Sequence, residues 1–136
     1  MTKTFDVVGI GNAIVDVLVQ ADDDLLDNFE LTKGTMALVD EHQAETLYAQ
    51  VGPGLETSGG SAANTLAGVA QLGGRAGFIG RVRNDQLGGI FAHDIRSVGA
   101  RFETPAATEG PSTARCLILV TPDAQRTMCT YLGASV

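Results

Sequence analysis

The 136 residues suffice for one domain with a substantial core and are too few for two domains of ordinary size. Hydrophobic residues make up 44% of the chain and charged residues 18%, which excludes a disordered protein. The net charge of −7 and the lack of a Lys/Arg stripe argue against nucleic acid as a partner, although one arginine or helix end can still hold a phosphate.

Alternating hydrophobic patterns predict a chain of strands and helices. Asp40 with Gln43 resembles a capping box, and Asn84 or Asp85 can cap a later helix. In chain order we predict strands at 5–10 and 14–21, a short helix at 22–29, a strand at 34–40, a helix from 41 to the stop at Gly52, a helix at 61–72, a strand at 75–80, a helix at 85–98, a strand at 100–104 and a two-stranded hairpin at 113–134. This order implies an α/β fold with a mostly parallel sheet, and the hairpin and early strands can form a separate small sheet.

The sequence shows no signal-peptide pattern at its N-terminus and no membrane-spanning apolar run. The N-terminal stretch MTKTFDVVGIGN lacks the apolar core of a signal peptide, and no apolar run approaches membrane-spanning length. Two cysteines, Cys116 and Cys129, are too few for a disulfide scaffold, so we expect reduced thiols in a cytoplasmic protein. A two-residue turn within 121–124 would place both thiols opposite each other; the alternative is a pair of separately buried cysteines.

The stretch GIGNAI at residues 9–14 invites a dinucleotide-binding interpretation, because G-x-G follows a predicted strand. The third glycine of that motif would fall at Ile14, and the β-branched residues that follow offer a pyrophosphate no helix N-terminus. The sequence also lacks a P-loop and the metal-binding spacings HExxH and CxxC, while His42 and His93 lie in separate predicted helices. The dinucleotide interpretation is therefore the weakest one, and no metal site is expected.

Asp16 interrupts an apolar predicted strand. A buried carboxylate is costly unless it is paired or meets a polar ligand, and this one could accept hydrogen bonds from neighbouring hydroxyls of a sugar. Strand alternation equally allows Asp16 to face solvent. The residue alone does not decide between the two interpretations.

A glycine-rich stretch, ETSGGSAANTLAGVAQLGG at residues 56–74, precedes a run of small apolar residues. Gly59 and Gly60 permit backbone angles that other residues avoid, and they let a ligand touch the main chain. Ser61 can cap the following helix, and Asn64 then projects from its first turn beside exposed backbone N–H groups. This arrangement is a polar grip for hydroxyls or an anion; the alternative is a hinge loop followed by a surface asparagine.

Four motifs in this order resemble the ribokinase-like (pfkB) family of carbohydrate kinases, and within it the adenosine kinase branch. The stretch GIGNAIVD resembles the opening strand with its substrate aspartate, SGGSAANTLAGVAQLG the first signature, FIGRVRNDQLGGIF the G-x-V-G-x-D-x-x-G segment, and TARCLILVTPDAQRTMCTYLGA the hairpin of the lid. The resemblance covers essentially the whole chain. Arg83 and Ala114 depart from it, because each stands where the family often has glycine.

The resemblance implies a three-layer α/β domain with a small β-sheet lid, whose strands lie within residues 14–40 and 113–134. It implies transfer of the γ-phosphoryl group of ATP, with Mg²⁺, to a hydroxymethyl group of a nucleoside or sugar. An adenosine kinase-like activity fits best, and a ribokinase or fructokinase type is the alternative. The implied substrate-binding residues are Asn12, Asp16, Gly59, Gly60, Asn64 and Cys116, with Gly59–Gly60 also the lid hinge and Arg126 approaching the phosphates.

The second signature of the family, a D-T-x-G-A-G-D-type segment with the catalytic base and anion hole, is not found in this sequence. Phosphoryl transfer depends on positioning and charge neutralisation, so we expect the 136 residues alone to be inactive and to bind neither ATP nor Mg²⁺. We interpret them as the N-terminal part of a longer kinase whose catalytic residue lies outside this chain. The non-enzymatic alternative is a binding module that forms a homodimer through the lid edge.

Overall fold

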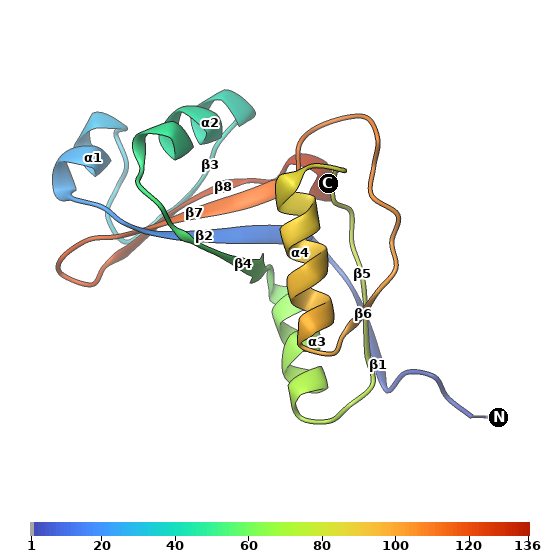
Figure 1. Cartoon of the computed structure of the whole chain (residues 1–136). Coiled ribbons are helices and arrows are strands. Elements are labelled where there is room, and N and C mark those ends of the chain that lie inside the picture. Colours follow the sequence, from blue (N-terminus) through green and yellow to red (C-terminus); the bar gives the residue numbers. More distant parts are fainter. Residues whose placement is uncertain (1) are drawn as a thin grey trace. The chain divides into compact units, whose positions relative to one another are not determined.

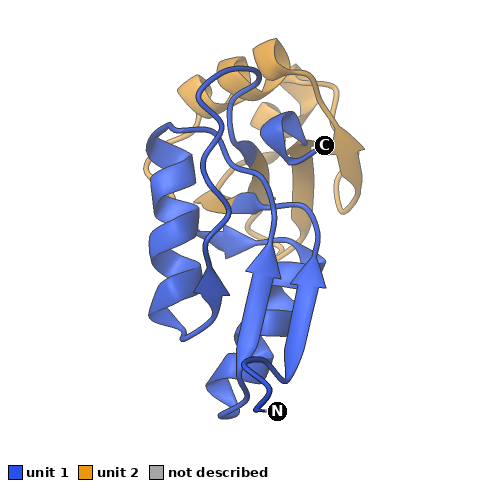
Figure 2. Cartoon of the chain, turned by 90° about the vertical axis from the view of Figure 1, so that its right-hand side faces the viewer, with its two compact units in different colours: residues 1–15, 57–114, 132–136 blue, residues 16–56, 115–131 orange. Residues whose placement is uncertain are grey.

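The computed structural model describes residues 2–136, which divide into two compact units (Figure 2). Unit 1 contains the residues up to Val15, residues 57–114 and residues 132–136. Unit 2 contains residues 16–56 and 115–131. The chain therefore passes between the units four times, and we call these passages connections 1 to 4: after Val15, after Glu56, after Ala114 and after Tyr131.

Unit 1 is built on a three-stranded parallel sheet with the order β1-β5-β6 (Figure 1). Its elements are β1 (Val7–Ile10), α3 (Ser61–Gln71), β5 (Ala76–Ile79), α4 (Gln86–Ser97), β6 (Arg101–Phe102) and the short 3₁₀ helix η1 (Gly133–Ser135). Parallel neighbours need crossover connections, and α3 leads into β5 as α4 leads into β6. The predicted mostly parallel α/β sheet is confirmed here.

The core of unit 1 is an aromatic cluster between the sheet and α4. The ring of Phe91 on α4 lies 5.7 Å from that of Phe78 on β5 and 5.3 Å from that of Phe102 on β6, measured between centroids. All three residues are at most 2% exposed. Tilted and edge-to-face ring pairs of this kind add to the free energy gained from burial.

The G-x-G of the N-terminal strand serves close helix packing. A Cβ atom at Gly9 would stand 2.4 Å from Cδ2 of Leu66, and one at Gly11 would stand 2.7 Å from Cβ of Ala62. Both neighbours lie on α3, so the two glycines let this helix approach β1. The motif thus has a packing reason within unit 1.

One face of the unit 1 sheet stays largely exposed. Gly9 faces α3, so its neighbours along β1, Val8 and Ile10, point to the opposite side, where they are 49% and 78% exposed. Ile79 at the end of β5 is also exposed. A shallow hollow of about 270 Å³ lies there, lined in part by Phe5 and Arg101. Among the described residues, unit 1 therefore supplies a sheet with helices on one side.

Unit 2 is built on a five-stranded mixed sheet with the order β3-β8-β7-β2-β4. Its elements are β2 (Ile14–Gln20), α1 (Asp23–Asn28), β3 (Met36–Leu38), α2 (Glu41–Gln50), β4 (Leu55–Gly59), β7 (Ala114–Val120) and β8 (Arg126–Tyr131). β7 and β8 form an antiparallel hairpin, and β3 runs parallel to β8. The strands β2, β4 and β7 begin or end in unit 1, since the connections fall within them.

One face of the unit 2 sheet is largely buried, whereas the other mixes exposed side chains with the buried Cys116 and Thr130. Val17, Val19, Leu117 and Leu119 are at most 3% exposed and share the side of Cys129. Cys129 lies in a groove with residues of α2 and of the chain between α1 and α2. The other side, which we call the open face, carries Asp16, Leu18, Cys116, Ile118, Met128 and Thr130, with Met36 and Leu38 of β3 in register beside the last two. On β3 the side chain of Leu38 is 64% exposed.

Most predicted elements are confirmed, with shorter bounds. The capping box at α2 is present, since Gln43 N–H donates to Asp40 Oδ1 and Asp40 N–H donates to Gln43 Oε1. Asp85, and not Asn84, caps α4. The strand β4 was missed, because Leu55–Gly59 has few β-branched residues and ends in glycine.

The two-residue turn considered within 121–124 does not form, and the alternative of two separately buried cysteines is confirmed. Thr121 N–H donates to the carbonyl of Gln125, so the turn spans residues 121–125 and shifts the register. Leu117 then pairs with Cys129, and Cys116 pairs with Thr130. The two cysteines lie on opposite faces of the sheet, and both are free thiols.

The two departures at glycine positions cause no backbone strain. Within residues 2–136, only Glu30 and Ala124 combine a side chain with a positive φ, so neither Arg83 nor Ala114 needs the left-handed conformation. The same part of the chain contains no helix of the length and apolarity that a membrane span requires.

Candidate functional site

Gly60, the second residue of the diglycine before α3, stands at a position that favours glycine alone. Gly60 has a φ of 96°, which L side chains rarely adopt. A Cβ atom there would also stand 2.5 Å from the carbonyl oxygen of Asn12. The structure thus brings two predicted site residues together in unit 1, with the main chain of Asn12 packed against the main chain of Gly60.

Gly60 is also the N-cap of α3, and the prediction of Ser61 in that role is wrong. The carbonyl of Gly60 accepts the first helical hydrogen bond, from Asn64 N–H at 2.9 Å, so Ser61 is already the first helical residue. No described side chain caps this helix end. The first N–H groups of the helix therefore lack a side-chain cap, and they lie at the positive end of the helix dipole beside the exposed Asn64.

Asp16 and Cys116 form the polar part of the open face in unit 2. They lie on the neighbouring strands β2 and β7, and burial raises the pKa of the Asp16 carboxyl above its ordinary value. Burial also raises the pKa of the Cys116 thiol; the Thr130 hydroxyl, donating to Sγ at 3.3 Å, opposes this, and the nearby charge of Asp16 adds to it. The structure thus brings a half-buried carboxylate and a neutral thiol together.

Arg126 lies apart from this pair. It stands at the start of β8 in register with Val120, beside the turn, whereas Cys116 is in register with Thr130. Four residues of strand separate Arg126 from Thr130, which amounts to roughly 13 Å. Unit 2 therefore does not place the Arg126 backbone beside Asp16, and an approach to phosphates would rely on the length of its exposed side chain.

The described residues offer no evident metal centre. No group of three or more His, Cys, Asp or Glu residues within 2–136 is arranged to hold a metal ion. The exposed side chains of His42 and His93 lie on α2 and α4.

Sequence reasoning missed one residue beside the diglycine, Asp94 on α4. Its Oδ2 accepts a hydrogen bond of 2.9 Å from the main-chain N–H of Ser58, two residues before Gly60. An acidic residue in the last turn of a helix is unfavourable, because the C-terminal end of the helix dipole is negative. An acidic residue at this end of a predicted helix could therefore have indicated from the sequence that Asp94 has a partner outside the helix.

Comparison with known proteins gives these two regions a context. The profile of the "pfkB family carbohydrate kinase" matches residues 35–136. Among curated proteins, probable fructokinase-3 of Arabidopsis thaliana is 33% identical over 81 residues, which are 60% of this chain and 24% of that protein.

Solved structures match almost the whole chain. Adenosine kinase from Sinorhizobium meliloti is 52% identical, with a TM-score of 0.88 over 98% of this chain and 41% of that one. Anopheles gambiae adenosine kinase in complex with P1,P4-di(adenosine-5) tetraphosphate is 28% identical, with a TM-score of 0.80 over 94% of this chain and 41% of that one. The chain thus spans about a quarter to two fifths of the length of these relatives.

Proposed function

Since the chain belongs to the pfkB family of carbohydrate kinases, we propose that it supplies the substrate-binding side of an ATP-dependent kinase for adenosine or a closely related nucleoside. The observation that carries this proposal is the 52% identity to the S. meliloti adenosine kinase over 98% of the chain. Fructokinases match less of the chain, for example the A. thaliana protein at 33% identity over 60% of it, so a sugar such as fructose is the second candidate.

The open face of unit 2 has the chemistry that a nucleoside requires. A carboxylate accepts hydrogen bonds from two neighbouring hydroxyls, and Asp16 is a half-buried carboxylate whose cost of burial such hydroxyls would offset. Leu18 and Ile118 flank Asp16 and Cys116 along β2 and β7, and they offer an apolar surface to a heterocyclic base. Asp16 would therefore orient the ribose, and Cys116 would contact the base.

In unit 1 the proposed contribution comes from α3 and from the loop before β2. Asn12 and Asn64 would bind substrate hydroxyls with their amide groups, next to the uncapped N–H groups of the helix. Gly59 and Gly60 would allow unit 2 to close as a lid, which excludes water from the reacting phosphoryl group. Arg126 would approach the phosphates.

The reaction needs groups that these residues do not provide. ATP with Mg²⁺ would supply the phosphoryl group and its charge neutralisation, yet residues 2–136 contain neither an acidic cluster for the metal nor a phosphate-binding glycine loop. We therefore propose that the 136 residues bind the acceptor substrate without turnover. The two free cysteines suit a reducing compartment, and we place the protein in the cytoplasm.

Calorimetric titration of the 136-residue chain with adenosine, ribose and fructose tests the proposal. We expect adenosine to bind, and Asp16→Ala to weaken the affinity at least about tenfold, because hydrogen bonds to a charged group contribute about 1.5–3 kcal/mol. Asp27→Ala, which changes an exposed carboxylate on α1, is the matched control and should bind as the wild type does. Unchanged affinity in Asp16→Ala would remove this residue from the site.

A phosphoryl-transfer assay separates the kinase from the non-enzymatic alternative. We expect no turnover above background from the 136 residues, and measurable turnover would contradict the proposed need for further residues. A module that acts by dimerisation would instead show association in sedimentation without nucleoside binding, since β3 and β4 are edge strands that could pair with a second copy. Binding of NAD would revive the dinucleotide interpretation.

A further inference from the structure

Helix α4 carries two carboxylates that bind the main chain of the connections between the units. We propose that Asp85 and Asp94 are positioning residues: they hold the unit 1 ends of connections 2 and 3, and so restrict the reorientation of unit 2. The contacts of both carboxylates lie within unit 1. The consequence for ligand affinity rests on the proposed function, whereas the consequence for motion does not.

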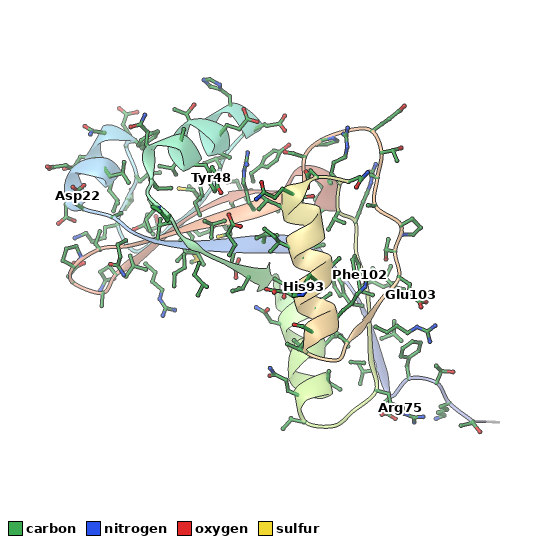
Figure 3. All side chains as sticks on the ribbon, viewed as in Figure 1. Asp22, Tyr48, Arg75, His93, Phe102 and Glu103 are labelled. Atoms are coloured by element: carbon green, nitrogen blue, oxygen red, sulfur yellow. The ribbon has the colours of Figure 1, made fainter. Side chains whose placement is uncertain are left out.

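Asp94 holds connection 2. Its Oδ2 accepts from the N–H of Ser58 at 2.9 Å, and Ser58 is the second residue after the passage from unit 2. Figure 3 labels the neighbouring His93 on α4, whose Nδ1 lies 3.9 Å from the other oxygen of Asp94. The hydrogen bond constrains the backbone directly, because its donor is a main-chain group.

Asp85 holds connection 3 with both of its oxygens. Oδ2 accepts from the main-chain N–H of Thr113 at 2.9 Å, and Oδ1 accepts from the Thr113 hydroxyl at 2.6 Å and from Gly88 N–H at 2.8 Å. The Thr113 hydroxyl oxygen also accepts from Arg83 N–H at 3.0 Å. Thr113 is fully buried and lies two residues before the passage into unit 2.

The other two connections join the same series of contacts. Connection 4 is attached to connection 3, because Ala134 N–H donates to the carbonyl of Ser112 at 2.8 Å. Connection 1 is attached to connection 2 through the packing of the Asn12 carbonyl against Gly60. All four connections are therefore linked on the unit 1 side, and α4 is the element in the middle of the series.

Helix stability alone does not explain these two carboxylates. Capping α4 requires one oxygen accepting from Gly88 N–H, and a neutral Asn or Ser would serve, yet Asp85 uses its second oxygen for Thr113. Asp94 opposes the helix dipole in the last turn. Both residues thus accept hydrogen bonds from the main chain of the connections, and these bonds are not needed to stabilise the helix.

The contacts of Ser58 and Gly60 also change where the hinge between the units is expected. With Ser58 bound to Asp94 and Gly60 packed on Asn12, the diglycine lies inside the anchored segment. Reorientation of unit 2 would then turn on residues 56–57 and 114–115, and rotation at Gly59–Gly60 would first require release of the Ser58 bond. Asp94 would thereby control the predicted hinge.

Nuclear magnetic resonance of the 136-residue chain tests the proposal. In Asp94→Ala we expect the Ser58 amide to exchange at least about tenfold faster. Residual dipolar couplings, fitted separately for each unit, should show weaker alignment of one unit relative to the other. Asp94→Asn keeps one acceptor oxygen and should give an intermediate effect. Asp27→Ala, which removes an acid from the last turn of α1, is the matched control and should change neither signal.

A second variant distinguishes the loss of a single contact from a general destabilisation of α4. Asp85→Asn retains a good N-cap for Gly88 but loses one of the two acceptor oxygens, so we expect faster exchange of the Thr113 amide with α4 amides unchanged. Faster exchange in either variant with unaltered alignment of the two units would show a merely local role and overturn the proposal. Unaltered exchange in both variants would overturn it as well.

Nucleoside affinity provides a separate outcome. If the wild type binds adenosine, Asp94→Ala should bind it more weakly, since a freer unit 2 loses more conformational entropy on binding. If the wild type does not bind adenosine, the proposed function fails, while exchange and alignment still decide the role of Asp85 and Asp94.

Discussion

The two regions that carry the predicted site residues are built by different means. In unit 1 the region around Gly60 is shaped by backbone conformation, because glycine and main-chain groups determine what fits there. In unit 2 the open face owes its chemistry to side chains, above all the half-buried carboxylate of Asp16. The first region should therefore respond to steric change, whereas the second should respond to burial and pH.

The largest expected effect tests whether the open face depends on the packed face behind it. Leu117 is fully buried, and its neighbour Ile118 lies on the open face. Leu117→Ala should lower the free energy of unfolding by about 2–5 kcal/mol through lost burial and a cavity, and Ile118→Ala should cost clearly less. Urea unfolding measures both. Equal losses would mean that the two faces are not distinguished by packing.

Gly60→Ala tests the steric nature of the region in unit 1. The new Cβ would meet the Asn12 carbonyl oxygen and would require a positive φ, so we expect a loss of roughly 2–4 kcal/mol in the free energy of unfolding. Gly68→Ala on the same helix is the control, since a methyl group there would meet no heavy atom within 4 Å outside its own stretch of helix, and it should stabilise by about 0.5–1 kcal/mol. Equal stability of the two variants would contradict a steric role for Gly60.

Asp16→Asn tests whether the stability of unit 2 depends on pH through its half-buried carboxylate. Burial raises the folded-state pKa of Asp16, so the folded protein binds this proton more tightly than the unfolded chain does. The stability associated with Asp16 is therefore present at low pH and decreases as pH rises from the unfolded value of 3.8 through the raised folded value. At neutral pH we expect Asp16→Asn to be more stable than the wild type, and thermal unfolding across pH measures the difference. If the wild type were instead more stable than Asp16→Asn at neutral pH, the expected effect of Asp16 on stability would have the wrong sign.

The smallest expected effect concerns a surface contact of unit 2. Tyr48, labelled on α2 in Figure 3, donates from its hydroxyl to Glu56 Oε1 at 2.8 Å, and this bond raises the Tyr48 pKa while the nearby Arg115 lowers it. Glu56→Gln should bring the Tyr48 pKa down toward 10.0, and Arg115→Met should raise it further. The tyrosinate absorbance reports both changes. An unchanged Tyr48 pKa in Glu56→Gln would show that this hydrogen bond does not form in solution.

Elements with strong local signals were predictable from the sequence. The capping box of Asp40 and Gln43 places the start of α2, and Asp85 caps α4, because caps act within three residues. The incorrect prediction of Ser61 as the N-cap of α3 also came from a local preference. Ser61 is a good cap by composition, but the positive φ of Gly60 already turns the chain into the helix.

The sequence named candidate site residues, but it could not give their contacts. The adenosine kinase and fructokinase relatives confirm the family that four motifs indicated, whereas the roles of Asn12, Asp16, Gly59, Gly60, Asn64, Cys116 and Arg126 stay predictions. The bond between Ser58 and Asp94 joins residues 36 positions apart, and no spacing rule reaches that far.

The sequence by itself determined the order of strands and helices and the family, because periodicity, caps and motifs are written within short stretches of chain. Only the tertiary structure decided which side chains share a face. The turn at 121–125 set Cys116 and Cys129 on opposite sides of the hairpin, and the approach of α3 explained Gly9 and Gly11. The physical reason is that register and close packing depend on residues distant in the chain, whose contacts form only when the whole sheet is assembled.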